Sequence, residues 1–142
     1  MSDEAQSEAE AGLSDQYRKA SPWPLSVALG IVLSEVGVIL GLFPVTVGGL
    51  LLFGGTVAGI LRESGYVGRP SAAMAALGIG LVTVGVLAIL LQVDPGTLSV
   101  DVLLDRSRPF VYRGSAIAVA GVILVAVAVG LFASNASNST TV

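Results

Sequence analysis

The chain has 142 residues, of which 54% are hydrophobic and only 12% are charged, and its formal net charge is −3. A soluble domain carries roughly 25% charged residues, so this composition indicates a protein that lies in lipid. Histidine and cysteine are absent, which excludes disulfides, thiolate and imidazole metal sites, haem ligation by histidine and a Ser-His-Asp triad. The acidic balance also argues against a nucleic-acid partner.

The N-terminal segment differs from everything that follows it. Residues 1–12 are acidic, small and polar, and we expect them to form a disordered tail. Residues 13–24 are predicted to be a juxtamembrane segment, in which Ser14 caps one or two helical turns. The prolines of Ser21-Pro22-Trp23-Pro24 keep this helix from continuing into the next segment. Trp23 is typical of an interfacial anchor at the level of the lipid headgroups, and the alternative is a docking motif for a partner.

A long apolar run covers residues 25–61 and is broken near its midpoint by Leu42-Phe43-Pro44. Because one membrane crossing takes about 20 apolar residues, we predict two transmembrane helices, at residues 25–42 and 44–61. Pro44 fits the first turn of the second helix. We therefore expect a very tight turn and an antiparallel pair of helices in contact.

Glycines are spaced for close helix packing in this predicted hairpin. Gly37 and Gly41 lie four residues apart, as do Gly55 and Gly59. Small residues at this spacing let two helix backbones approach closely. We predict that the two helices meet through these glycines, together with Gly48, and that Gly49 and Gly54 add further small surface.

Glu35 is the only charged residue between Pro24 and Leu61. An ionised carboxylate at the centre of a membrane helix costs about 2.5–3.5 kcal/mol, so such residues are functional candidates. We predict a neutral, structural Glu35 near the middle of its helix, hydrogen-bonded to a backbone carbonyl or to a hydroxyl group. The candidate hydroxyl groups are those of Ser34, Thr46, Thr56 and Thr83. A proton relay and a contact with another subunit remain as alternatives.

Two further apolar runs predict transmembrane helices at residues 72–93 and 114–132, which complete a membrane domain of residues 25–133. The polar connection at 62–71 contains Tyr66, an expected interfacial anchor. Ala76 with Gly80, and Gly114 with Gly121, are weaker small-residue pairs.

The connection at 97–113 is long enough to be functional or bound to a partner, and the alternative is an interfacial lid. Residues 98–102 alternate between apolar and polar, which is typical of a strand. Tyr112 is a third expected interfacial anchor. Residues 134–142 form a polar tail with two Asn-x-Ser/Thr motifs, at Asn135 and Asn138.

The predicted fold is an all-α integral membrane protein with four transmembrane helices in two hairpins. We expect it in the cell membrane as a multi-pass protein. Arg18 and Lys19 precede the first helix, which favours a cytoplasmic N-terminus. Glycosylation at Asn135 or Asn138 would favour the reverse orientation.

Residues 12–70 carry motifs that together resemble one family. They include Ser-Pro-Trp-Pro at 21–24, Ser-Glu-Val-Gly at 34–37, Gly-Leu-Phe-Pro-Val at 41–45 and Ala-Gly-Ile-Leu-Arg-Glu-Ser-Gly-Tyr at 58–66. On these motifs the chain resembles the small haloarchaeal membrane proteins called cox cluster protein, which are encoded beside genes for haem–copper terminal oxidases. The acidic, lysine-poor composition agrees with a salt-adapted organism. The resemblance implies a link to the respiratory oxidase and supplies no catalytic or cofactor-binding residue.

The leading hypothesis is a non-catalytic accessory or assembly subunit of a terminal oxidase, with no enzymatic activity and no metal or cofactor of its own. Its partners would be the lipid bilayer, the oxidase subunits and, in a homo-oligomer, further copies of the chain. The alternative is a small transporter or proton pathway centred on Glu35. A membrane protein unrelated to respiration is the third interpretation. Access of water to Glu35 separates the transporter from the subunit, in which Glu35 faces a packed helix or a partner.

Overall fold

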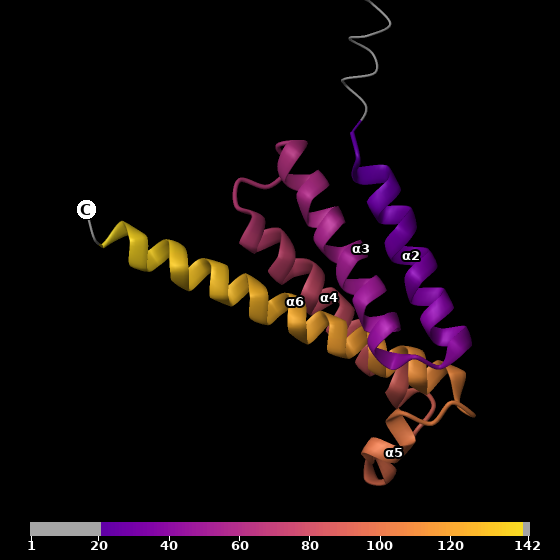
Figure 1. Ribbon diagram of the computed structural model, residues 1–142. Coiled ribbons are helices and arrows are strands. Elements are labelled where there is room, and N and C mark those ends of the chain that lie inside the picture. The colour runs from indigo at the N-terminus through magenta and orange to yellow at the C-terminus, as the bar shows by residue number, and fades with distance from the viewer. Residues whose placement is uncertain (1–20, 141–142) are drawn as a thin grey trace, which may run out of the picture.

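Figure 1 shows the computed structural model, which describes residues 21–140 of the chain as an assembly of helices. The four long helices are α2 (Trp23–Leu40), α3 (Phe43–Glu63), α4 (Pro70–Leu90) and α6 (Pro109–Ser139). Each is long and apolar enough to cross a membrane. No strand occurs within residues 21–140, so the all-α prediction is confirmed for this part of the chain. The predicted acidic tail and most of the juxtamembrane segment lie outside the described residues.

Two short elements lie between α4 and α6: the 3-10 turn η1 (Pro95–Thr97) and the single helical turn α5 (Val100–Leu103). The strand-like alternation at 98–102 therefore does not form a strand. Ser99 caps α5, and its Oγ accepts a hydrogen bond from the Val102 N–H at 3.3 Å. A serine that satisfies a free N–H group in this way favours a helical start over an extended segment.

Proline marks the beginning of each long helix. Pro24, Pro44, Pro70 and Pro109 all lie in a first helical turn, where the missing N–H has no partner to lose and the fixed φ suits the helix. As a result, α4 begins two residues and α6 five residues before the predicted starts at 72 and 114. Hydropathy predicted where the apolar segments begin, whereas proline determines where the helices begin.

The turn between α2 and α3 is the predicted break in the apolar run. Gly41 has a φ of 65°, the left-handed conformation that glycine adopts without a steric cost. The Leu42 N–H donates to the Gly37 carbonyl at 2.8 Å, and the Gly41 N–H donates to the Val38 carbonyl at 3.1 Å. This pair of bonds is the Schellman arrangement that ends a helix. The prediction of two helices rather than one kinked helix is confirmed.

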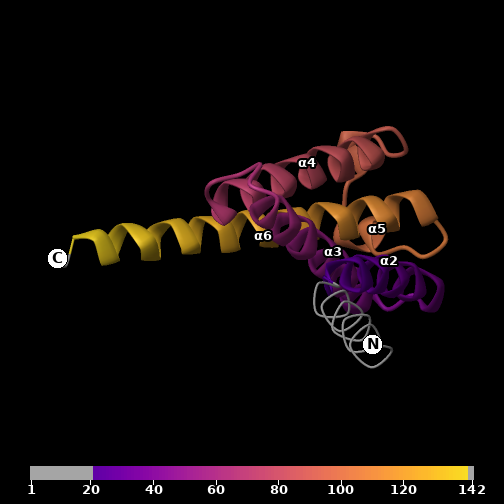
Figure 2. The same cartoon turned by 90° about the horizontal axis from the view of Figure 1, so that it is seen from above.

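The long helices form two hairpins, because the most extensive contacts are those of α2 with α3 and of α4 with α6. Helix α3 then packs on both α4 and α6 and joins the hairpins, as the two views show (Figures 1 and 2). The buried centre of this junction contains Val47, Ala116 and Ala120, with Phe43, Leu50 and Leu51 packed against it. Many large apolar side chains stay exposed on the outer surface of α2, α4 and α6, and Leu52 is exposed on α3.

Helix α6 is longer than predicted and projects beyond the other helices at its C-terminal end (Figure 2). The polar tail expected from residue 134 is helical as far as Ser139, and residues 141–142 lie outside the described part. The Ser134 hydroxyl donates to the Leu131 carbonyl at 3.0 Å, and the Ser137 hydroxyl donates to the Ser134 carbonyl at 2.9 Å. Low hydropathy therefore ends the apolar segment here without ending the helix.

Candidate functional site

The most unusual polar feature on the long helices is an ion pair between Glu35 of α2 and Arg113 of α6. The Arg113 Nη2 lies 2.5 Å from the Glu35 Oε2. Both side chains are about half exposed, at 51% for Glu35 and 46% for Arg113. The prediction that Glu35 bonds a hydroxyl or a backbone carbonyl is therefore wrong, because its partner is an arginine 78 positions further along the chain. Arg113 lies in the connection predicted at 97–113, outside the apolar runs that contain the candidate hydroxyl groups.

The ion pair lies toward one end of the bundle. Glu35 is five residues from the end of α2, and Arg113 is four residues from the start of α6. At 1.5 Å per residue, each side chain is attached about 6–8 Å inside its helix end. The predicted position of Glu35 near the middle of its helix is corrected by the observed bounds, since α2 begins and ends two residues earlier than expected.

A small open cavity of about 120 Å³ lies beside the ion pair, where α2, α3 and α6 meet. The charged pair, two hydroxyl-bearing residues and three apolar residues line it: Ser34, Glu35, Val38, Thr46, Leu50, Arg113 and Ile117. The Ser34 hydroxyl donates to the Ile31 carbonyl, and the Thr46 hydroxyl donates to the Leu42 carbonyl. Both hydroxyl protons are therefore used within their own helices, which leaves the ion pair as the polar centre of the cavity.

The contact between α2 and α3 uses only some of the predicted glycines, together with Gly30. Gly37 packs against the Thr46 backbone, as expected. A Cβ at Gly30 would lie 2.9 Å from the Gly49 carbonyl oxygen, so these two glycines bring the backbones together. Gly48 and Gly55 have nothing within 4 Å of their Cβ positions. The prediction that they form the helix contact is wrong.

The two remaining predicted packing glycines serve other partners. Gly41 lies in the turn after α2, where a Cβ would lie 2.5 Å from the Nε of the Arg106 guanidinium. Gly59 faces the Trp23 ring, whose nearest carbon would lie 2.7 Å from a Cβ at this position. Gly59 therefore receives an aromatic side chain rather than a helix backbone.

Helices α4 and α6 meet through glycines that the prediction undervalued or missed. A Cβ at Gly85 would lie 2.6 Å from the Gly114 carbonyl oxygen, and one at Gly78 would lie 2.8 Å from the Gly121 carbonyl oxygen. In each helix the two glycines are seven residues apart, which places them on one face two turns apart. Gly30 and Gly37 of α2 share this spacing. Gly48 and Gly55 of α3 are also seven residues apart but face open space, so this spacing alone does not identify a packing face.

Trp23 joins the two ends of the first hairpin. Its indole N–H donates to the Glu63 Oε2 at 2.5 Å, and its ring covers Gly59. These contacts orient the ring at the end of the helices where α2 begins and α3 ends. The roles of Trp23 as an interfacial anchor and as a docking motif remain predictions.

The two tyrosines differ in their surroundings. Tyr66 is 83% exposed in the connection after α3, and its role as an anchor stays a prediction. Tyr112 is only 3% exposed, and its ring meets the Phe43 ring edge to face with centroids 5.6 Å apart. The predicted interfacial anchor Tyr112 is thus buried in the bundle, because α6 already begins at Pro109 and turns this side chain toward α3. Its buried hydroxyl has no hydrogen-bond partner in the described part of the chain.

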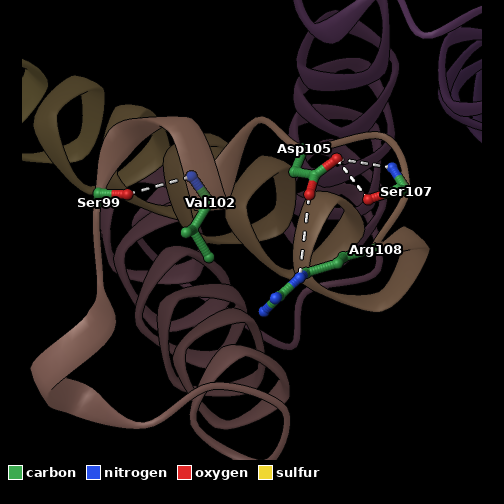
Figure 3. A network of polar contacts seen from close by, with 5 residues as sticks. All are labelled: Ser99, Val102, Asp105, Ser107 and Arg108. Atoms are coloured by element: carbon green, nitrogen blue, oxygen red, sulfur yellow. Dashed lines mark hydrogen bonds and ion pairs between the residues drawn. The ribbon is translucent and has the colours of Figure 1, made fainter.

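The connection between α4 and α6 is held by a small polar network, which Figure 3 shows. The Asp105 Oδ1 accepts hydrogen bonds from the Ser107 hydroxyl at 2.6 Å and from the Ser107 N–H at 2.9 Å. The Arg108 Nε lies 3.9 Å from the other oxygen of the same carboxylate. The two Ser107 bonds, followed by the Arg108 charge, lower the pKa of Asp105 below its usual 3.8.

This connection also contacts both hairpins. The Arg106 guanidinium lies over Gly41, at the C-terminal end of α2, where a positive charge complements the helix dipole. The Ser115 hydroxyl of α6 lies 2.9 Å from the Leu103 carbonyl after α5 and 2.8 Å from the Tyr112 carbonyl of its own helix, so its one proton is shared between the two acceptors. The loop thus packs onto the same end of the bundle as the Glu35–Arg113 pair. A partner-binding role for it stays a prediction.

The chemistry available at the site is that of an ion pair. Within residues 21–140, no three acidic side chains gather in a way that could hold a metal ion. A family model described as a family of unknown function, DUF7541, matches residues 1–134, a range that contains both charged residues of the pair. Comparisons with curated proteins and with solved structures give no match. The chain therefore belongs to the DUF7541 family, and its function must be argued from its own residues.

Proposed function

We propose that this chain is a multi-pass protein of the cell membrane, with a cytoplasmic N-terminus, that acts as a non-catalytic accessory or assembly subunit of a respiratory haem–copper terminal oxidase. The observation that carries membrane insertion is the outer surface of the bundle. Four helices have the length and apolar character of membrane spans, and leucine, isoleucine and valine side chains stay exposed along α2, α4 and α6. Exposure of this apolar surface to water is unfavourable, whereas the hydrocarbon chains of lipid are as apolar as the surface itself.

The link to the oxidase rests on the resemblance of residues 12–70 to cox cluster proteins. The side-chain inventory agrees with a supporting role, since a chain without histidine or cysteine lacks the usual haem and copper ligands. A subunit of this kind contributes helix surface to a larger complex and leaves electron transfer to the other subunits.

Purification of the tagged full chain in a mild detergent tests this proposal. We expect oxidase subunits, identified by mass spectrometry, and a haem Soret band to accompany the chain. When the oxidase is removed by a harsher detergent, the isolated chain should show no Soret band and no stoichiometric metal. Recovery of the chain from mild detergent without oxidase subunits or haem would contradict the subunit function and favour a role outside respiration.

A second candidate, a proton pathway or small transporter, is favoured by one observation. The cavity beside Glu35 places a half-exposed carboxyl group between three helices, next to an arginine. Intramembrane acidic residues in such positions mark proton relays in pumps and transporters.

Oxygen consumption by cells carrying substitutions at the pair separates the two functions. A relay needs the carboxyl group itself, so Glu35→Gln and Glu35→Gln/Arg113→Gln should both be as inactive as Glu35→Leu. An accessory subunit does not need the carboxyl group itself, but it needs a site at which neither Glu35 nor Arg113 is left as an unpaired charge. The double variant, which has no unpaired charge, should therefore consume more oxygen than Glu35→Gln alone. Equal loss in all three variants, with the oxidase still assembled, would favour the relay.

A further inference from the structure

The Glu35–Arg113 pair is incomplete within a single chain. One guanidinium nitrogen meets one carboxylate oxygen, although an arginine has five N–H donors and a carboxylate accepts about four hydrogen bonds. Neither side chain has a second polar partner among the described residues. Both are about half exposed and line a small open cavity, so their remaining donors and acceptors are accessible from outside the bundle.

The surface around the pair is apolar. Ile31 and Ile39 lie one turn on either side of Glu35 along α2 and are 48% and 79% exposed. Phe110 lies one turn before Arg113 on α6 and is 67% exposed. Apart from Arg62 and Glu63 at the end of α3, the long helices carry no other charged residue. A half-exposed ion pair within such a surface is poorly solvated by lipid, so its free polar groups favour a protein partner.

One positive and one negative group side by side form a self-complementary surface. A two-fold axis through this face brings each carboxylate opposite the other copy's guanidinium, because a residue contacts its counterpart reciprocally across such an interface. We propose that a second copy of this chain packs here, so that each Arg113 bonds Glu35 of both copies. The four charges then alternate in sign, and Ile31, Ile39 and Phe110 surround them. This dimer rests on the membrane insertion in the proposed function and is independent of the link to the oxidase.

Mixed charge reversal tests the reciprocal contact in the full chain. A Glu35→Arg copy carries two positive side chains at the site, and an Arg113→Glu copy carries two negative ones. In liposomes, we expect the wild type to be dimeric and each variant alone to dimerise at least about tenfold more weakly, which corresponds to 1.4 kcal/mol. The two variants together, with different tags, should form a mixed dimer. Their association also shows that both variants fold.

Cross-linking of the otherwise wild-type chain supplies a second measurement, because the sequence contains no cysteine. Ile39→Cys next to Glu35 should give a cross-linked dimer with a short bismaleimide. Val84→Cys, which is also well exposed but lies on α4, is the matched control and should stay monomeric.

Three results would overturn the proposal. The first is a wild type that stays monomeric in liposomes at every concentration. The second is that each charge-reversal variant still dimerises with itself and the two variants form no mixed dimer. The third is cross-linking of Val84→Cys but not of Ile39→Cys. Capture of a different membrane protein at Ile39→Cys, with no dimer, would assign this face to that protein and would also overturn the proposal. Extraction of cell membranes with alkaline carbonate tests insertion separately. If the chain stays in the membrane but is monomeric, the dimer proposal fails and the proposed membrane insertion stands.

Discussion

The contacts inside each hairpin differ in kind from the contact between the hairpins. Inside the hairpins, glycines bring backbone against backbone: Gly30 meets Gly49, and Gly85 meets Gly114. Between the hairpins, side chains such as Leu124, which lies over Gly54, fill the space. The Glu35–Arg113 pair and the Phe43–Tyr112 ring contact also cross this junction. Each hairpin therefore tolerates little added side-chain volume at its helix contact. The relative position of the two hairpins depends instead on side chains that can change conformation.

The largest expected effect is a substitution inside a hairpin. Gly85→Leu places a side chain where even a Cβ would lie 2.6 Å from the backbone of α6. We expect a loss of about 3 kcal/mol, at the upper end of the cost of overpacking, because backbone cannot move aside as a side chain can. Thermal unfolding in detergent, followed by circular dichroism, measures the loss.

Gly80→Leu is the matched control, since Gly80 lies on the same helix and faces open space. Gly55→Leu on α3 is a second control for the same reason. If Gly85→Leu unfolds at the same temperature as these two variants, then backbone contact does not hold the second hairpin together.

A smaller effect of opposite sign is expected at the junction between the hairpins. Tyr112→Phe removes a buried hydroxyl that has no partner within residues 21–140 and keeps the ring contact with Phe43. An unpaired buried polar group costs about 1–3 kcal/mol, so we expect this variant to unfold at a higher temperature. Tyr66→Phe, at an exposed position, should leave the unfolding temperature unchanged. A lower unfolding temperature for Tyr112→Phe would mean that the hydroxyl has a partner, such as a buried water molecule.

The hydrogen bond at the open end of the first hairpin should contribute less. Trp23→Phe keeps an aromatic ring over Gly59 but removes the N–H donor to Glu63. We expect a loss of about 1 kcal/mol in the free energy of unfolding. Glu63→Gln keeps an acceptor and should lose less. A larger loss for Glu63→Gln than for Trp23→Phe would show that the Glu63 charge has another role.

The smallest effect belongs to the exposed loop network. Because the folded pKa of Asp105 lies below 3.8, the contribution of this carboxylate to stability is present above pH 3.8 and is lost as the pH falls through the folded value. An NMR titration of the Ser107 amide should report this low pKa. Ser107→Ala removes the hydroxyl donor, which is the largest cause of the shift, and should raise the pKa toward 3.8. An unchanged pKa in that variant would assign the shift to another group.

The sequence predicted what hydropathy and local turn chemistry determine. The four helices, the break before Pro44 and the pairing of consecutive long helices all followed from apolar segment length and proline. The position of Tyr112 and the partner of Glu35 did not, because both depend on α6 beginning at Pro109, in a segment whose low hydropathy is typical of a loop. Arg113 lies far from Glu35 along the chain, so no local pattern in a single sequence connects the two residues.

A double-mutant cycle on Glu35 and Arg113 tests most directly whether this pair links the two hairpins. Thermal unfolding in detergent is measured for the wild type, Glu35→Gln, Arg113→Gln and the double variant. Each single change leaves one charge without its partner, whereas the double change leaves none. We predict that the double variant loses less stability than the sum of the single variants, by about 0.5–3 kcal/mol. Losses that simply add would contradict the link and would leave the two side chains as independent surface charges.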